Sequence, residues 1–353
     1  MKLHILIGGA GFLGRHLLEE LWPEYNEDRF LIIDHYEKTD LMKDLPLSNN
    51  QNIMFLECNL EELSLWDEYC CWRSREHEND YDGIYIYHFA SPVGVLNHNE
   101  STFYRAMYIN QNVYNFACNL LTFKSSQSSR NIYKFFYMSS SELYGSINEN
   151  TFDTKLDTFV DLSKNLGGFR SDYIYQKFLG EELFKQLSKY YSVNILRLFN
   201  IVGKYQDPNK GVFNLFIDNI VFDKLCIIND SIRSYTPFNI FTDTVINLIN
   251  NKCSSGFNIT NVCSEDFKLS LTTEELYMYL RQYLVTNYEG IKSTSKNFTF
   301  MEFKGEIKYR GSTNTISYLN FVKNFGWIID EYIVWAHTEL KRTKHYMLRE
   351  LKQ

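Results

Sequence analysis

The sequence is poor in proline and has no excess of basic residues. Only 5 prolines occur among 353 residues, so we expect few long irregular segments. The formal net charge is -7, whereas a general nucleic-acid binder normally carries a basic excess. No nucleic-acid partner is therefore predicted, although a phosphate site, which needs only a few arginines and backbone amides, is compatible with this charge.

Patterns of metal-ligating and disulfide-forming residues are also missing. The 7 cysteines are odd in number and form no C-x-x-C pair, and the 8 histidines form no H-E-x-x-H pattern. We expect no metal, and free thiols that suit a reducing compartment. No run approaches the ~18 apolar residues of a membrane span, and the N-terminal apolar run is too short for a signal peptide. We therefore expect a cytoplasmic protein with no membrane partner.

Short apolar runs alternate with longer segments of helical periodicity up to about residue 200. The runs cover residues 3–7, 30–33, 53–56, 84–89, 133–138 and 193–198, and the helical segments cover residues 12–22, 104–121 and 171–190. This alternation predicts an α/β fold with a Rossmann-type doubly wound parallel sheet.

Less regular features complete the outline of the chain. The first helix is expected to stop before Pro23. Residues 73–82 and 124–130 are polar and predict surface loops, and residues 256–259 predict a strand that returns to the main sheet. The tail, residues 331–353, predicts a charged surface helix.

Three glycines, Gly8, Gly11 and Gly14, lie between the first strand and the first helix. Residues without a Cβ allow the backbone to touch a pyrophosphate, which then rests on the N–H groups of the helix start, at Phe12 and Leu13. Glycines at such a turn can also be purely structural. The position directly after a strand and before a helix favours dinucleotide binding.

Asp34 ends the second predicted strand, 20 residues after Gly14. A carboxylate there can accept hydrogen bonds from both ribose hydroxyls and repels a 2′-phosphate, so NAD is favoured over NADP. The alternative is that Asp34 merely caps the following turn, since Asp is a common turn residue.

Tyr173 and Lys177 are four residues apart on a predicted helix and share one face. A phenol normally has a pKa near ~10, and a neighbouring ammonium can stabilise its ionised form so that it acts as a base. The Tyr-x-x-x-Lys spacing also arises by chance in a chain with 26 tyrosines. Here it follows a serine cluster that includes Ser140, at the carboxyl end of the fifth strand, where ligands bind in open α/β sheets.

Together these residues resemble the extended short-chain dehydrogenase/reductase family of nucleotide-sugar epimerases, dehydratases and decarboxylases. The segments that carry the resemblance are residues 8–14, Asn59, residues 88–90 ending at Ala90, Asn112-Val113, residues 140–145, Tyr173 with Lys177, residues 198–200 with Gly203, residues 233–235, and residues 325–327. The resemblance covers nearly the whole chain. It departs from the family where Ile7 replaces the usual Thr and where no Asp follows Arg233 in register.

The resemblance implies NAD as the cofactor and a nucleotide-diphosphate sugar as the substrate. It implies that Tyr173 takes the proton of the sugar 4-hydroxyl, that Ser140 holds the same oxygen, and that Lys177 binds the nicotinamide ribose. The resemblance assigns the adenine side of the cofactor to Asn59 and makes Ala90, after the fourth strand, a further cofactor-binding candidate.

The second chemical step stays open between epimerisation, 4,6-dehydration and decarboxylation. Glu142 is a candidate base at C5, with Ser141 at the position of the dehydratase acid and Arg170 as in the decarboxylases. Glu142 could equally be a structural, salt-bridged residue and Arg170 a solvated charge. Asn200, Arg233 and Arg310 are candidates for substrate binding, because Arg suits bidentate contact with phosphate, although Arg310 is placed only by its position near the C-terminal signature.

The resemblance also implies two domains and a homodimer. Residues 1–200, with 236–262 returning, are expected to form the NAD-binding Rossmann domain, and residues 201–235 and 263–353 the smaller nucleotide-sugar-binding domain and C-terminal helix. The dimer would pair the helices at residues 103–121 and 171–190 of both subunits. Alternative functions are a simple C4 dehydrogenase, an NADPH-dependent ketosugar reductase, and a non-catalytic NAD-binding sensor or scaffold protein.

Overall fold

A computed structural model of the chain describes residues 1–35, 51–75, 81–92, 100–124, 132–144, 171–208, 211–251, 256–264, 269–289, 291, 297–301, 309–310 and 315–336. The chain divides into two compact units. Unit 1 comprises Met1–Leu143, Val160–Leu198 and Thr242–Asn261, and unit 2 comprises Tyr144–Phe159, Phe199–Phe241 and Val262–Gln353.

Unit 1 is built on a seven-stranded sheet. Its strands are β1 (Lys2–Ile7), β2 (Arg29–Asp34), β3 (Ile53–Glu57), β4 (Gly83–His88), β5 (Ile132–Ser140), β6 (Ser192–Leu198) and β11 (Gly256–Val262), in the spatial order β11-β6-β5-β4-β1-β2-β3. The pairs from β3 to β6 are all parallel. The strand order reverses between β1 and β4, which is the point where an open α/β sheet binds its ligand. The predicted Rossmann-type fold and the return of residues 256–259 are confirmed.

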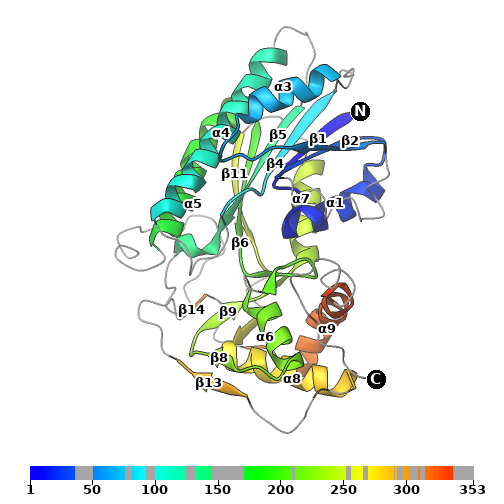
Figure 1. The fold of residues 1–353 in the computed structure, drawn as a ribbon, viewed down its shortest axis with the longest axis vertical. Helices are drawn as coiled ribbons and strands as arrows, with labels where there is room; N and C mark the ends of the chain where they lie inside the picture. The colour runs from blue at the N-terminus through cyan, green and yellow to red at the C-terminus, as the bar shows by residue number, and fades with distance from the viewer. Residues whose placement is uncertain are drawn as a thin grey trace. The chain divides into compact units, whose positions relative to one another are not determined.

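Helices cover both faces of this sheet (Figure 1). One face carries α3 (Leu65–Arg75), α4 (Glu100–Lys124) and α5 (Ser171–Lys185), which a 3₁₀ turn, η4 (Gln186–Lys189), extends. The other carries α1 (Phe12–Glu24) and α7 (Phe238–Asn250). The strands alternate between these layers: Leu3, Ile5 and Ile7 of β1 belong to the buried cluster that includes residues of α3, α4 and α5.

The face that carries α1 and α7 contains polar side chains. Lys134 of β5 is buried, and its Nζ donates to the carbonyl oxygens of Leu248 at 2.8 Å, Ile249 at 2.7 Å and Asn251 at 2.5 Å. The last carbonyls of a helix have no partner within the helix, so this ammonium caps the end of α7.

Unit 2 has shorter strands than unit 1. It contains the short strands β7 (Ile201–Val202), β8 (Cys226–Ile228), β9 (Ile232–Ser234), β10 (Thr236–Pro237), β12 (Ser270–Thr272), β13 (Phe298–Phe300) and β14 (Tyr309–Arg310), with helices α6 (Val212–Val221), α8 (Thr273–Asn287) and α9 (Tyr318–Trp335). A second buried cluster joins the apolar faces of these three helices. The assignment of this unit to nucleotide-sugar binding stays a prediction.

Four local predictions are wrong or incomplete. Helix α1 continues through Pro23 to Glu24, because a proline in the last turn removes only one helical hydrogen bond. Residues 73–75, expected in a loop, end helix α3, whose buried side chains Leu65, Tyr69 and Trp72 follow helical spacing. Lys124, at the start of the second expected loop, still belongs to α4, and residues 125–131 lie outside the described ranges.

The fourth of these predictions concerns the C-terminal helix. Helix α9 begins at Tyr318, well before the expected residue 331, and its buried face includes Phe321, Phe325 and Ile328. It is therefore a core helix of unit 2 and not a charged surface helix as far as Trp335. Residues 337–353 lie outside the described part of the chain. No described helix has the length and apolar character needed to cross a membrane.

Candidate active site

The glycine turn after β1 is held by close contacts between backbones. Gly8 has a φ of +76°, and a Cβ on Gly8 would lie 2.6 Å from the backbone nitrogen of Ala90. A Cβ on Gly14 would lie 2.4 Å from the carbonyl oxygen of Gly9. Only glycine meets both conditions, so the turn, the start of α1 and the residues after β4 pack together through main chain alone.

The start of helix α1 has no side-chain cap. Gly11 is the N-cap and offers no side chain to the helix, and the first helical hydrogen bond runs from Arg15 N–H to Gly11 oxygen at 3.0 Å. The N–H groups of Phe12, Leu13 and Gly14 precede that bond in the first turn, at the positive end of the helix dipole. This arrangement fits a pyrophosphate.

Asp34 is the last residue of β2, and Asn59 lies two residues after the neighbouring strand β3. The carboxylate of Asp34 is buried and accepts hydrogen bonds from Ala10 N–H at 3.1 Å and His35 N–H at 2.9 Å. Asp34 therefore caps the local turn, and its contact with the ribose hydroxyls of a dinucleotide stays a prediction. Asn59 Oδ1 accepts from Glu61 N–H at 3.2 Å.

The serine cluster and Glu142 stand where β5 ends. Ser139 and Ser140 are the last residues of β5, and Ser141 and Glu142 open the short 3₁₀ turn η2 (Ser141–Tyr144). All four are buried, and the Glu142 N–H donates to Ser140 Oγ at 3.2 Å. The candidate proton-handling groups Ser140 and Glu142 thus lie next to each other at the carboxyl edge of the sheet.

Tyr173 and Lys177 share one face of α5, as their spacing predicts. Lys177 is buried, its Nζ donates to the carbonyl oxygen of Met138 at 2.8 Å, and it lies 5.8 Å from the centre of the Tyr173 ring. Since Met138 is two residues before Ser140, the ammonium sits close to the end of β5. Burial lowers the pKa of Lys177 to about 8, and the charge of Glu181 opposes that shift.

Glu181 and Arg197 were not among the residues predicted for the site. The buried guanidinium of Arg197 on β6 donates to both carboxylate oxygens of Glu181, at 2.9 and 2.7 Å. The Ser139 hydroxyl donates to the same carboxylate at 2.5 Å. The signal available in the sequence was spacing, since Glu181 lies four residues after Lys177 on the same helix face.

The predicted substrate residues fall into three groups. Ser141 is buried in unit 1 beside Glu142, and Arg170 lies outside the described residues. In unit 2, Asn200 has a φ of 33°, its Nδ2 donates to Ser234 oxygen at 3.0 Å, and its own carbonyl accepts from Thr236 N–H at 3.1 Å. Asn200 therefore fixes the turn that follows Phe199.

The two candidate arginines of unit 2 lie on paired strands. Arg233 on β9 is in parallel register with Arg310 on β14. Arg233 is buried, and its Nη1 donates to Ile232 oxygen at 3.0 Å. The structure thus brings together two residues that are 77 positions apart (310 minus 233). In the described ranges no cluster of three or more His, Cys, Asp or Glu side chains could hold a metal ion.

The buried Glu181–Arg197 pair predicts a large stability effect. Arg197→Met removes the guanidinium that binds both oxygens of the buried Glu181 carboxylate, and we expect a loss of about 3–5 kcal/mol in the free energy of unfolding, measured by urea titration at neutral pH. Removing both charges in Arg197→Met/Glu181→Gln should restore part of this loss.

A second pair with the same geometry provides the control. Arg105 donates to both oxygens of Glu61 at 2.8 and 2.7 Å, but the two side chains are 53% and 31% exposed. Arg105→Met should therefore cost only about 0–1 kcal/mol. Equal losses in the two Arg→Met variants would contradict the role assigned to burial.

Comparison with known proteins places the chain in a family. Its fold is similar to UDP-glucuronic acid 4-epimerase from Bacillus cereus in complex with UDP-glucuronic acid and NAD, with TM-score 0.68, 19% identity, and 95% of this chain and 99% of that chain covered. UDP-N-acetylglucosamine 4-epimerase from Methanobrevibacter ruminantium M1 gives TM-score 0.67, 20% identity and coverage of 95% and 99%. NAD-bound dTDP-glucose 4,6-dehydratase from Bacillus anthracis gives TM-score 0.65 and 15% identity, with 97% of this chain and 98% of that chain covered.

At these identities the structural likeness shows the fold alone. No curated protein sequence gives a significant match. The model of the NAD dependent epimerase/dehydratase family matches residues 4–243, which is more than half of the chain and includes both the glycine turn and the Tyr173–Lys177 helix. The chain therefore belongs to the NAD-dependent epimerase/dehydratase family.

Proposed function

We propose that the protein oxidises a nucleotide-diphosphate sugar at C4 with NAD, and that a second step on the resulting ketone gives the product. The observation that carries the proposal is the placement of Lys177 beside Tyr173 at the carboxyl end of β5, two strands from the glycine turn after β1. Ligands of open α/β sheets bind along this edge.

The residues of unit 1 fit NAD. The first-turn N–H groups of α1 suit the pyrophosphate, Asp34 suits the adenosine ribose, and Asn59 lies after the adjoining strand β3, on the side assigned to the adenine. The similar B. cereus and B. anthracis structures are NAD complexes. Bound NAD supplies the hydride acceptor that oxidation of a sugar carbon requires.

Tyr173 acts as the base for the 4-hydroxyl. Its phenolate is stabilised by the Lys177 ammonium one turn further along α5, and Lys177 also binds the nicotinamide ribose. Ser140 donates to the substrate oxygen and holds it in line with Tyr173. Arg233 and Arg310 bind the substrate pyrophosphate, as their common register on β9 and β14 supports.

Glu142 is proposed as the group that acts on the ketosugar, as a base at C5. The C4 ketone acidifies the neighbouring C–H groups, and Glu142 follows Ser140 by two residues at the end of β5, near the first base. Ser141 stands where a dehydratase has its acid, and Arg170 is the residue that favours decarboxylation. A protein without this second step would be a simple C4 dehydrogenase.

Tyr173→Phe tests the chemistry. We expect turnover to fall by at least ~10²-fold, because general base catalysis typically contributes that much, while the dissociation constant for NAD, measured by quenching of protein fluorescence, changes little. Tyr175→Phe is the matched control on the same helix, since Tyr175 is also partly buried. Unchanged turnover in Tyr173→Phe would contradict the proposed base, and no turnover by the unaltered protein would favour an NAD-binding sensor.

The reaction is read from product masses with a panel of UDP-, GDP-, CDP- and dTDP-sugars as substrates. Loss of water identifies a dehydratase, and loss of carbon dioxide identifies a decarboxylase. An unchanged mass with altered stereochemistry identifies an epimerase, and loss of two hydrogens with accumulating NADH identifies a simple dehydrogenase.

Asp34→Asn tests the choice of cofactor. The substitution removes the charge that repels a 2′-phosphate but keeps an acceptor for Ala10 N–H, so the ratio of NAD to NADP affinity should fall by about tenfold. Asp67→Asn, at an exposed position of α3, should leave the ratio unchanged. Tighter binding of NADP than of NAD by the unaltered protein would favour the ketosugar reductase.

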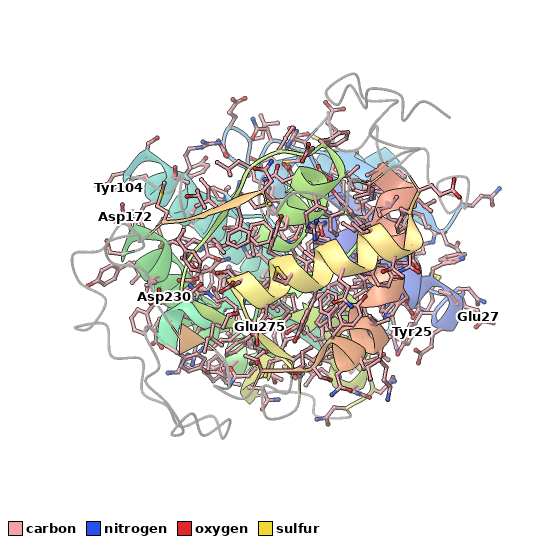
Figure 2. The ribbon with its side chains drawn as sticks, turned by 90° about the horizontal axis from the view of Figure 1, so that it is seen from below. Tyr25, Glu27, Tyr104, Asp172, Asp230 and Glu275 are labelled. Atoms are coloured by element: carbon pink, nitrogen blue, oxygen red, sulfur yellow. The ribbon has the colours of Figure 1, made fainter. Side chains whose placement is uncertain are left out.

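We also propose that the protein is a homodimer whose subunits pair through α4 and α5. These helices present Tyr104 (62% exposed), Tyr108 (52%) and Leu179 (39%), and Figure 2 shows Tyr104 of α4 and Asp172 of α5 on the outside of their layer. Apolar and aromatic side chains of this kind are enriched in interfaces.

Light scattering should give twice the chain mass of 41.9 kDa. Leu179→Arg should shift the protein toward monomer, since it buries an unpaired charge in the interface. Leu215→Arg, at a comparably exposed site on α6, should not. A monomer at every concentration tested would remove the dimer from the proposal.

A further inference from the structure

The Lys177 ammonium lies within about 6 Å of the centres of two aromatic rings. Its Nζ is 5.8 Å from the centre of the Tyr173 ring and 5.3 Å from the centre of the Tyr137 ring, and it donates one hydrogen bond of 2.8 Å to Met138 oxygen. An ammonium within about 6 Å of a ring centre is attracted by the negative face of the ring. Tyr137 is therefore a second aromatic partner of Lys177, on the strand and not on the helix.

Tyr137 is held firmly in this position. It is buried on β5, and its ring lies 4.8 Å from the ring of Phe184 and 5.5 Å from that of His88. Its hydroxyl occupies the space that a side chain at position 180 would need, because a Cβ on Gly180 would lie 2.2 Å from that oxygen. The absence of a side chain at Gly180, three residues after Lys177, lets the Tyr137 ring lie close under α5.

We propose that Tyr137 is a positioning residue that acts through Lys177: the face of its ring stabilises the charged ammonium and fixes it next to Tyr173. The consequence for catalysis rests on the proposed function of Tyr173 as a base. The electrostatic effect on Lys177 does not depend on that function and can be measured without substrate.

Apart from the two rings, the groups around Lys177 give its positive charge only limited support. Burial opposes the charge of Lys177 and lowers its pKa to about 8. Glu181 supports the charge from α5, but its carboxylate is also bound by Arg197 of β6. On β4, burial lowers the pKa of His88 to about 3, so His88 is neutral at pH 7.

Tyr137 itself contributes no charge. Burial raises the pKa of its hydroxyl well above the usual range, and the charge of Glu181 adds to this shift. A neutral ring keeps its quadrupole at every pH at which the enzyme would work. The charge balance at Lys177 is therefore set by Glu181, by burial and by the faces of two rings.

Graded fluorination of the ring tests the proposal. Tyr137→Phe keeps the ring, and monofluoro-, trifluoro- and pentafluorophenylalanine at the same position withdraw its electron density stepwise with little change in shape. Lysine labelled with ¹³C at Cε reports the protonation of Lys177 by NMR, with the resonance assigned from its loss in Lys177→Met. We expect the pKa of Lys177 to fall stepwise, by about 1 from Phe to pentafluorophenylalanine.

The same series predicts the pH dependence of turnover. Since the ammonium is the required form, turnover should decline as the pH rises through the pKa of Lys177, and this alkaline limb should move to lower pH together with the NMR titration. Phe135 gives the matched control. It lies two residues earlier on β5 and packs on the same Phe184 ring at 4.7 Å, and its fluorination should leave the titration of Lys177 unchanged.

Each outcome decides the question. A pKa of Lys177 that does not follow fluorination at position 137, or that follows fluorination at position 135 equally, overturns the proposal. If the pentafluoro variant fails to fold, the slope across the Phe, monofluoro and trifluoro variants decides. If the unaltered protein turns over no nucleotide sugar, the proposed function fails. The NMR titration of Lys177 then still tests whether the ring of Tyr137 stabilises the ammonium.

Discussion

The carboxylate of Glu181 is the group on which the candidate active site of unit 1 depends. It is buried, and it is the counterion of Arg197 on β6 and the electrostatic support of Lys177 on α5. A buried cation is costly unless an anion faces it, and here one anion serves two cations from neighbouring elements. The hydroxyl of Ser139 adds a third contact and ties the end of β5 to the same carboxylate. Helix α5, β5 and β6 are thereby fixed relative to one another at the end of β5, beside the candidate residues Tyr173 and Ser140.

The fold of unit 1 was predictable because its signals are local. The strands from β1 to β6 contain short apolar runs, and the segments that form α1, α4 and α5 have helical periodicity, so the alternation predicts a parallel sheet covered on both faces. The errors also have local causes. Helix α3 carries Trp66, Tyr69 and Trp72 among charged residues. These charged residues made the helical periodicity of its apolar positions hard to recognise in the sequence. Pro23 lies so near the end of α1 that its missing hydrogen bond matters little.

Some contacts of the candidate site follow from local sequence spacing, and others depend on packing between segments that are distant in the sequence. The pairing of Tyr173 with Lys177 follows from spacing on one helix, and Ser140 and Glu142 are close because only one residue separates them in the sequence. The contact between Glu181 and Arg197 joins a helix to a later strand, and that of Lys177 with Tyr137 joins a helix to an earlier one. Nothing in the sequence distinguishes Tyr137 from the other 25 tyrosines, because only packing decides which ring lies under the ammonium. Arg310 is an intermediate case, since register on β14 relates it to Arg233 but its sequence position alone did not.

Lys134 gives helix α7 an unusual ending. Most helices finish on a glycine or on solvent-exposed carbonyls that fray at low energetic cost, whereas the carbonyls of Leu248, Ile249 and Asn251 are held by an ammonium that belongs to the central sheet. If the last turn of α7 opened, the buried ammonium of Lys134 would lose these hydrogen-bond acceptors. Amide exchange in this turn should then proceed with the opening of β5, so that the terminus of the helix and the middle of the sheet form one cooperative element of the native state.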